Sequence, residues 1–306
     1  MQRTLSGPAM GSRWTARLDC DARQAVTLTG VCAAAVEAVE HQTSNWLRDS
    51  DLNRLNAAPV GDWVTLPDHL MTVLVKSLQI GRETDGLFDI GVGALVQAWG
   101  FGPAEGAADT TAISAHLGHS LRTSDALDLS SHSALKRKPL TLDLSGIAKG
   151  YGVDVLAQTL RDHGFTDALC GLDGELVAMG TRQDGQPWAV ALEQPDPTRR
   201  TGRSLIELSD RAIATSGSYR HFVTVGNLRV SHTMNPRTGG PAISPLVSVS
   251  VVHDTCMEAD ALATVLMVLG DKAAQEFAKA RGLQAIFLTE LAGEITETVT
   301  GFSQNT

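Results

Sequence analysis

The amino-acid sequence predicts an α+β fold in which a mixed or antiparallel sheet packs against helices. Three observations predict it. Several long segments repeat apolar residues at spacings of three and four, as amphipathic helices do. The middle of the chain, from 188 to 231, instead holds short apolar runs separated by turn residues, which is typical of antiparallel strands. No repeat, low-complexity tract or linker divides the 306 residues, so we expect a single domain over 1–306.

The expected strands alternate apolar and polar residues or form short runs rich in β-branched residues. In chain order they are 14–18, 140–144, 167–172, 175–179, 188–192, 204–208, 212–215, 221–225, 228–231, 246–252 and 284–289. The expected helices each carry apolar residues at helical spacing between turn or capping residues. They are 24–42, 68–84, 87–99, a short one near 113–117 within a surface excursion over 104–139, 147–156, 256–269 and 271–281.

Composition excludes several classes of protein. A net charge of -9 leaves no basic surface to replace the counterions of a nucleic acid, so we expect no nucleic-acid partner. No run approaches the ~20 apolar residues of a membrane span, and no signal peptide is seen. As written the chain is expected to be cytoplasmic, or to work in the bacterial periplasm or cell envelope if a leader was removed. The four cysteines lie far apart and are expected to be small buried hydrophobes.

The segment 140–154 (LTLDLSGIAKGYGVD) is the centre of the chain's chemistry. An alternating strand leads through a small-residue turn into a helix, which Ser145 or Asp143 can cap. The free amides at such a helix start can bind a phosphate group. The order of Gly146, Lys149 and Gly150 matches neither a Walker loop nor a dinucleotide fingerprint. The alternative is an ordinary strand–turn–helix connection with glycines for close packing.

Two polar residues in the late helix are candidates for a metal site. Asp260 and Thr264 lie four residues apart, so their oxygens point from one helix face. A carboxylate and a hydroxyl are hard ligands, and Mg²⁺ completes its shell with water and substrate phosphate oxygens. The alternative is that Asp260 favours the helix start by its charge while Thr264 bonds back to a carbonyl.

One histidine and one tryptophan stand in unusual contexts. His232 precedes a rigid turn, where an imidazole can act as a general base or have a structural role. Trp46 lies among Ser44, Asn45 and Asp49 and can face a ligand or the core.

Taken together, these segments resemble the ApbE family of FAD:protein FMN transferases. The blocks that carry the resemblance occur in the family's order along nearly the whole chain: Met10–Ser12, Ser44–Trp46, Asp49–Asp51 with Arg54–Asn56, Asp85–Asp89, Trp99–Gly102, Asp143–Asp154, Ala214–Tyr219, His232–Gly239 and Ala259–Thr264. The resemblance implies an ApbE-like, T-fold-like domain with two lobes. It also implies an enzyme that uses Mg²⁺ to move FMN from FAD onto a threonine of a target flavoprotein, releasing AMP.

The family's site residues carry over to matching positions of this chain. Magnesium is expected to be held by Asp260, Thr264 and the backbone carbonyl of Gly146. We expect His232 to be the base that accepts the threonine proton. Contacts with FAD are expected at Met10, Trp46, Leu87, Phe88, Asp89, Asp143, Lys149 and Met234.

Two positions depart from the family pattern. Asn235 stands where the family usually has an aspartate three residues after the histidine, which removes a charge near His232. Asp173-Gly174 stands where the family tends to have paired glycines, and this acid can face the site or only change a turn. Two other functions remain open: a metal-dependent FAD pyrophosphatase that yields FMN and AMP, and a flavin-binding carrier without turnover.

Overall fold

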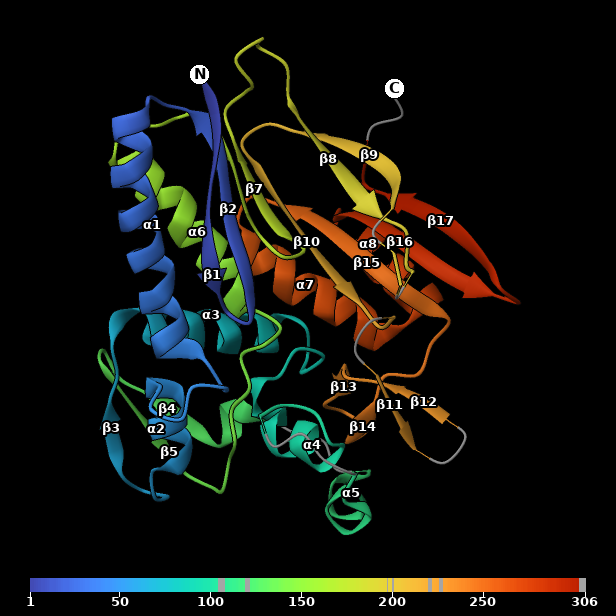
Figure 1. The fold of residues 1–306 in the computed structure, drawn as a ribbon. Helices are drawn as coiled ribbons and strands as arrows, with labels where there is room; N and C mark the ends of the chain where they lie inside the picture. The colour runs from blue at the N-terminus through green and yellow to red at the C-terminus, as the bar shows by residue number, and fades with distance from the viewer. Residues whose placement is uncertain are drawn as a thin grey trace.

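A computed structural model describes residues 1–103, 108–118, 122–196, 198–199, 201–219, 222–225 and 228–302 (Figure 1). Its centre is an eight-stranded sheet in the order β1-β2-β6-β7-β10-β15-β16-β17, in which every neighbouring pair is antiparallel. The sheet strands are β1 Gln2–Ala9, β2 Ser12–Asp19, β6 Ala168–Leu172, β7 Glu175–Met179, β10 Arg211–Gly217, β15 Leu246–His253, β16 Gln284–Leu291 and β17 Glu294–Thr300. The predicted α+β class with an antiparallel sheet is confirmed.

Smaller pairings surround this sheet. They are the hairpin β8 Trp188–Glu193 with β9 Gly202–Leu208, the pair β11 Phe222–Val225 with β12 Leu228–Ser231, the pair β13 Met234–Asn235 with β14 Gly240–Pro241, and the three-stranded sheet β3 Trp63–Thr65, β5 Ser133–Lys136 and β4 Leu127–Leu129. The helices are α1 Ala22–Thr43, α2 Asp51–Ala57, α3 Asp68–Glu83, the 3-10 helix η1 Ile90–Val92, α4 Gly93–Ala98, α5 Thr110–His116, the 3-10 helix η2 Thr123–Asp125, α6 Ala148–Asp162, α7 Cys256–Leu269 and α8 Asp271–Ala280.

The two faces of the large sheet are covered differently because side chains alternate along each strand. On β10, Ala212 and Ala214 belong to the core shared with α1 and α6. Ile213, between them, belongs to a separate core under the β8–β9 hairpin. Figure 1 shows the corresponding layers, with the helices on one side of the sheet and the hairpin on the other. The sheet therefore has both of its faces partly covered.

Helix α7 joins the sheet to the second lobe. Eleven of its 14 residues are buried, as expected of a helix that is apolar on nearly all sides. One side contributes Leu262 and Leu266 to the core against β15 and β16. The other contributes Met257 and Ala261 to the core of the lobe that contains α2, α3 and the three-stranded sheet. Two lobes thus meet along this helix (Figure 1).

The predicted strand at 140–144 is wrong. This segment joins no sheet, because its backbone groups bond to asparagine side chains and to the backbone of Ile90 and Gly93. The carbonyl of Leu142 accepts from Asn45 and Asn56 side chains at 2.8 and 3.0 Å, and its N–H donates to Asn56 Oδ1 at 2.8 Å. The Asp143 N–H also donates to the Ile90 carbonyl at 2.7 Å, and the Thr141 carbonyl accepts the Gly93 N–H at 3.0 Å. Two asparagines and the backbone of Ile90 and Gly93 therefore take the place of a neighbouring strand.

Other expectations changed in detail. The helix predicted to begin at Leu87 begins later, because the side chain of Asp89 caps η1 by accepting the Gly91 N–H. Strands β1, β3, β4, β5, β13, β14 and β17 and helices α2 and η2 were not predicted. Residue 221 of the strand expected at 221–225 lies outside the described residues, and 222–225 forms β11.

All four cysteines are buried and free, as expected. Within the described residues, none of the helices has both the length and the apolar character needed to cross a bilayer.

Candidate functional site

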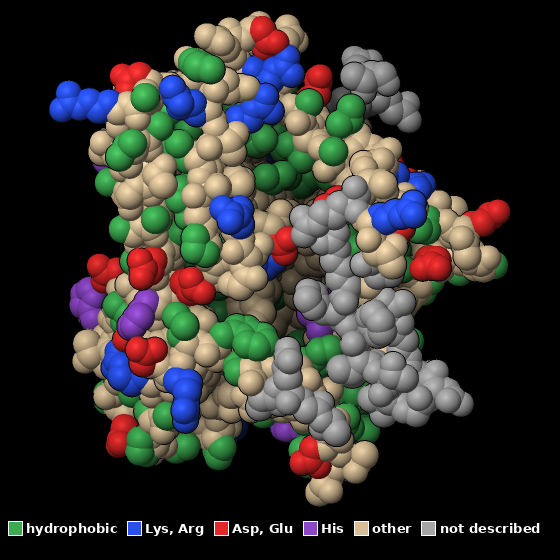
Figure 2. Space-filling view, viewed as in Figure 1, with side chains coloured by type: hydrophobic (Ala, Val, Ile, Leu, Met, Phe, Trp, Pro, Cys, Tyr) green, Lys and Arg blue, Asp and Glu red, His purple; other side chains and the backbone are tan. Residues whose placement is uncertain are grey.

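A cleft of about 1170 Å³ opens between the two lobes, and Figure 2 shows it as a hollow in the middle of this face. Its walls come from the β1–β2 turn, the α1–α2 loop, the segment around Phe88, the start of α6, strands β7, β8, β10 and β15, and α7. All twelve residues that the sequence nominated lie in its wall: Met10, Trp46, Leu87, Phe88, Asp89, Asp143, Gly146, Lys149, His232, Met234, Asp260 and Thr264. Their convergence is a finding about position, and their roles are taken up below.

The three residues nominated for a metal meet where α6 begins beside α7. Gly146 lies so close to Thr264 that a Cβ added to it would be 2.9 Å from Thr264 Oγ1. Ser216 Oγ on β10 lies 3.4 Å from the same hydroxyl. Asp260 is one helical turn before Thr264 on α7 and is only 4% exposed, at the floor of the cleft. A carboxylate, a hydroxyl and a carbonyl-bearing glycine therefore share one corner.

Asp260 also has a structural partner. Its Oδ2 accepts the backbone N–H of Gly150 at 3.0 Å in the first turn of α6. Neither of the predicted caps is used: Asp143 Oδ1 accepts the Ser145 N–H at 2.8 Å, and Ile147, which stands at the N-cap position of α6, forms no side-chain cap. The Gly150 amide at this helix start is therefore bonded to one of the protein's own carboxylates, which the positive end of the helix stabilises. Burial raises the pKa of Asp260, while Lys149 and the Gly150 amide oppose this change.

Lys149 is held by acids on the β6–β7 turn. Its Nζ lies 2.9 and 3.0 Å from the two carboxylate oxygens of Glu175 and 3.9 Å from Asp173 Oδ2. Burial lowers the pKa of Lys149, but Glu175, Asp260 and Asp173 outweigh it and the net change is upward. Burial likewise raises the pKa of Glu175, against the effect of Lys149. The ammonium group is therefore charged at the cleft wall.

The structure shows where Asp173 lies, which the sequence left open between the site and the turn. It lines the cleft and also occupies a left-handed backbone conformation, with φ of +56°, in the two-residue turn between β6 and β7. Glycine adopts this conformation without strain, and aspartate tolerates it better than most residues. The acid therefore both faces the site and sits in the turn.

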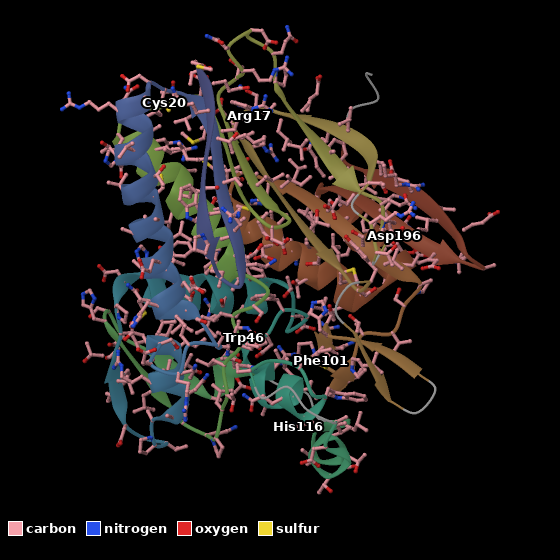
Figure 3. All side chains as sticks on the ribbon, in the orientation of Figure 1. Arg17, Cys20, Trp46, Phe101, His116 and Asp196 are labelled. Atoms are coloured by element: carbon pink, nitrogen blue, oxygen red, sulfur yellow. The ribbon has the colours of Figure 1, made fainter. Side chains whose placement is uncertain are left out.

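His232 lies between β12 and β13, half-buried, with its ring edge-on to Phe101 at a centroid distance of 6.3 Å. Figure 3 labels Phe101 and Trp46 on the lobe below the sheet. The turn after His232 depends on Asn235, whose side-chain oxygen accepts the Arg237 N–H at 2.9 Å and whose carbonyl accepts from Gly239. Asn235 thus supplies the turn's hydrogen bonds in place of the family's aspartate, without its charge.

The remaining nominated residues form apolar and aromatic parts of the wall. Leu87, Phe88 and Met234 are nearly buried, whereas Trp46 is 58% exposed at the cleft. Met10 has a φ of +48° in the β1–β2 turn, and its sulfur approaches Gly152 of α6. These surfaces suit a large flat ligand.

Asp89 lines the cleft, but its carboxylate is already used within the protein. It accepts from the Gly91 N–H at 2.7 Å, from the Thr123 N–H at 2.8 Å and from the Thr123 hydroxyl. Its side chain therefore shapes the wall of the cleft.

The donor set fits magnesium better than a transition metal. Among the residues that the structure describes, no three histidine, cysteine or acidic side chains gather as a metal cluster. Magnesium needs few protein ligands, since water and phosphate oxygens complete its octahedron. Asp260 Oδ2 accepts the Gly150 N–H, and the Asp260 carboxylate has further lone pairs that can bind an ion.

Sequence reasoning missed Glu175, which is 1% exposed in the cleft wall. Its signal was present: an acidic residue opens an otherwise apolar strand, and a buried carboxylate requires a partner. That partner, Lys149, is 26 residues away and could be identified only from the fold.

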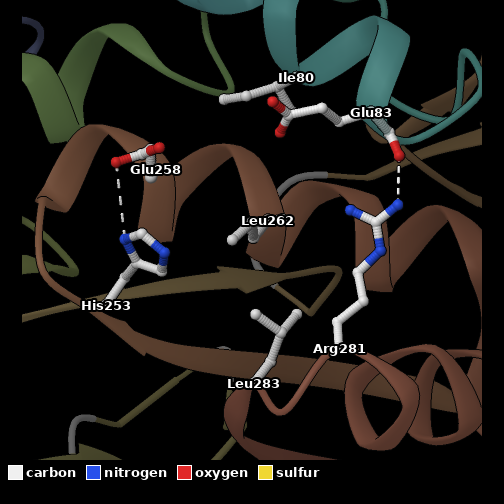
Figure 4. Close-up of a pocket in the computed structure, with 7 residues that line it drawn as sticks. All are labelled: Ile80, Glu83, His253, Glu258, Leu262, Arg281 and Leu283. Atoms are coloured by element: carbon white, nitrogen blue, oxygen red, sulfur yellow. Dashed lines mark hydrogen bonds and ion pairs between the residues drawn. The ribbon is translucent and has the colours of Figure 1, made fainter.

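A second hollow of about 350 Å³ lies between α3, α7 and the start of β16 (Figure 4). None of the nominated residues lines it. Its polar side chains have partners within the protein: His253 faces Glu258 at 3.7 Å, and Arg281 donates to the backbone carbonyl of Glu83. The large cleft is therefore the candidate active site.

The α+β fold has a deep cleft between its two lobes. This cleft is charged at its floor and aromatic at its rim, which is typical of an enzyme that holds an extended ligand. Comparison with known proteins identifies the family. The sequence profile of the ApbE family matches residues 10–287. The FAD:protein FMN transferase of Vibrio cholerae is 34% identical over 291 residues, covering 94% of this chain and 87% of that protein. The FAD:protein FMN transferase of Klebsiella pneumoniae is 34% identical over 298 residues, covering 95% and 85%.

The solved structure of the Pseudomonas stutzeri flavinyl transferase ApbE, in its apo form, matches with a TM-score of 0.86 and 31% identity, covering 98% of this chain and 95% of that one. The chain therefore belongs to the ApbE family. It is an enzyme of the transferase class, as the sequence predicted.

Proposed function

We propose that this protein transfers FMN from FAD to a threonine hydroxyl of a target flavoprotein, in the presence of Mg²⁺, and releases AMP. The transfer of FMN from FAD is supported by the names of its relatives. The dependence on Mg²⁺ and the threonine acceptor are our own inference.

One observation carries the proposal. Twelve residues from separate segments of the chain, which the sequence alone indicates as site residues, line the same cleft. The cleft joins a charged corner at Lys149 and Asp260 to an aromatic rim at Trp46. FAD has the same distribution, with a diphosphate between two flat ring systems.

Magnesium would be held by Asp260, Thr264 and the carbonyl of Gly146. An acidic protein that binds a diphosphate beside a buried carboxylate needs a cation between them, because like charges at short range repel strongly. Bound there, the ion would act as a Lewis acid on the phosphoryl oxygens.

The chain's own residues would then position and deprotonate the reactants. Lys149 would bind diphosphate oxygens, while Phe88 and Trp46 pack against the rings. The threonine oxygen bonds to the FMN phosphorus, and the bond from that phosphorus to the bridging oxygen breaks. AMP leaves with the bridging oxygen and its electron pair. His232 would accept the threonine proton as general base.

The test is incubation of the protein with FAD, Mg²⁺ and a threonine-bearing acceptor domain, followed by mass spectrometry of the acceptor. We expect the acceptor to gain the mass of one FMN less one water, because a phosphoester bond forms, and an equal amount of AMP to be released. The same acceptor with threonine replaced by alanine is the control. Free FMN with AMP would instead mean a pyrophosphatase, and FAD that persists unchanged would mean a carrier.

His232→Gln tests whether His232 acts as the general base without contributing to FAD binding. We expect transfer to fall by about 10²-fold or more, the usual effect of removing a general base, with FAD affinity kept. An unchanged rate would assign the proton to another group.

A further inference from the structure

Among the residues that the structure describes, three charged side chains are buried: Lys136, Glu175 and Asp260. Asp260 bonds the start of α6, and Lys136 donates to the carbonyl of Asn56. Glu175 is the most deeply buried of the three, at 1% exposed, and lies in the cleft wall. The proposed reaction has given it no role so far.

Glu175 and Lys149 are joined by a two-point contact. Both carboxylate oxygens accept from the Lys149 ammonium, at 2.9 and 3.0 Å. Glu175 is the first residue of β7, fixed in register opposite Leu172, and Lys149 lies in the first turn of α6. A rigid strand therefore holds the end of a side chain that otherwise has four rotatable bonds.

This pair is poorly explained as a stabilising device. Burying a carboxylate carries a large desolvation penalty, and a buried ion pair is often no more stable than apolar residues of the same volume. The strand around Glu175 is apolar, with Leu176 and Val177 following it. A role in the cleft explains this charged pair better. Lys149 is 31% exposed at the cleft, whereas Glu175 is buried behind it.

We propose that Glu175 is a positioning residue, which holds the Lys149 ammonium beside Asp260 so that it meets the diphosphate of the bound nucleotide. This inference rests on the proposed function of the cleft. Glu175 acts only through Lys149, since its carboxylate would repel a phosphate directly. Because Lys149 is ordered before the ligand arrives, less side-chain entropy is lost on binding.

The test is a double-mutant cycle on the dissociation constant of FAD, measured by flavin fluorescence with Mg²⁺ present. The variants are Glu175→Gln, Lys149→Met and the two combined. Glutamine keeps the shape of the side chain and removes the charge that fixes the ammonium. We expect Glu175→Gln to weaken FAD binding by about tenfold in the wild-type background and by less than about twofold beside Lys149→Met, because only contacting partners are coupled.

Two further variants guard against a structural explanation. Glu175→Asp keeps the charge and should recover part of the lost affinity. Lys76→Met removes a lysine that pairs with Glu258 at 3.1 Å outside the cleft and should leave FAD affinity unchanged. Midpoints of denaturant unfolding, measured for every variant, report on folding.

Equal losses in both backgrounds, or no loss with wild-type Lys149, would overturn the positioning role. The proposed function is judged separately by the mass of the acceptor protein. A wild-type enzyme that transfers FMN while the cycle is additive refutes only the role of Glu175. A coupled cycle in an enzyme that transfers no FMN supports the positioning role and refutes the transfer.

Discussion

The carboxylate of Asp260 accepts the backbone amide of Gly150 at 3.0 Å, so a residue of α7 caps α6. The reverse contact also exists, because Asp154 on α6 accepts the N–H groups of Cys256 and Met257 at 2.8 and 2.9 Å in the first turn of α7. Each helix thus supplies the anion that the start of the other requires. This reciprocal capping fixes the corner at which Gly146, Asp260 and Thr264 meet.

The double role of Asp260 predicts that two substitutions will differ in stability and agree in activity. Asp260→Asn keeps an oxygen for the Gly150 N–H and removes the charge. Asp260→Ala removes both, and should lower the free energy of unfolding by about 1–2 kcal/mol, as the loss of a helix cap does. Both should reduce magnesium-dependent AMP release by at least about 10²-fold.

These effects are measured by AMP chromatography across a magnesium titration and by urea unfolding. An alanine variant as stable as the wild type would contradict the capping role. A fully active asparagine variant would contradict the metal site.

Asp154 predicts a particular dependence of stability on pH. Burial raises its pKa from 3.8 to about 6, although the Met257 and Cys256 amides oppose this change. The folded state therefore binds the proton more tightly than the unfolded state, so this residue's contribution to stability falls as pH rises from about 4 to about 6. The loss is about 3 kcal/mol at most, at ~1.4 kcal/mol per pH unit of pKa difference.

Urea unfolding at pH 4.5 and pH 6.5 checks this prediction. Asp154→Asn should show less destabilisation between the two pH values than the wild type. Asp162→Asn, on the exposed face of the same helix, is the matched control and should follow the wild type. Parallel pH profiles for all three proteins would rule out Asp154 as the source.

Asp173 places an extra negative charge near the proposed diphosphate site, with its Oδ2 3.9 Å from Lys149 Nζ. Asp173→Gly should tighten FAD binding about two- to tenfold, since one partly screened charge contributes on the order of 1 kcal/mol. Asp210→Gly is the control, because Asp210 has a similar φ of +51° and does not line the cleft. Fluorescence titration measures both, and equal changes would point to the backbone instead of the charge.

Arg237 ties the turn after His232 to the loop before Phe88. Its guanidinium donates to the carbonyl of Asp85 at 2.8 Å and to its carboxylate at 2.7 Å. Lysine cannot reproduce this fork. Arg237→Lys should therefore lower kcat of FMN transfer several-fold, while the dissociation constant of FAD changes by less than about twofold, because a misplaced catalytic group slows chemistry more than binding.

Steady-state kinetics, together with fluorescence titration, separate these two effects. Arg182→Lys alters an exposed arginine that pairs with Asp184 and does not line the cleft, and it should change neither constant. A rise in the FAD dissociation constant with kcat unchanged would show that Arg237 supports the flavin site instead of His232.

The sequence predicted those helices and strands whose own residues are enough to determine their secondary structure. Helix α7 is a long, almost wholly apolar segment, and strand β15 alternates valine with serine. The i,i+4 spacing of Asp260 and Thr264 already put both oxygens on one face of α7. The prediction of a strand at 140–144 was wrong because the partners of this segment lie far away in the chain: the side chains of Asn45 and Asn56, 97 and 86 residues from Leu142, and the backbone of Ile90 and Gly93. Strands of three or four residues, such as β3 and β5, have too little alternation to detect.

In the candidate site, too, the sequence predicted local features and missed contacts between distant segments. Motif blocks identified the residues of the cleft wall, because each block is local. The pairing of Glu175 with Lys149 and the capping of α6 by Asp260 join distant segments. Such contacts depend on how the two lobes and the sheet come together, and no local pattern specifies that arrangement.

Gly146 gives a steric test of the cleft corner. A Cβ at this position would lie 2.9 Å from Thr264 Oγ1 and 3.6 Å from Phe88 Cε2. Gly146→Ala should therefore displace the Thr264 hydroxyl and reduce magnesium-dependent AMP release by about 10-fold or more, since small shifts of a catalytic group are costly.

Gly30→Ala is the matched control for this substitution. Gly30 lies within α1, and a Cβ there has no other atom within 4 Å. Alanine should raise the free energy of unfolding by up to about 1 kcal/mol, because glycine is a poor helix former, and should leave AMP release unchanged. Magnesium titration of AMP release compares the two variants. Because Gly146 offers only its backbone carbonyl, a fully active Gly146→Ala enzyme would show that the corner tolerates a methyl group and that the ion lies elsewhere.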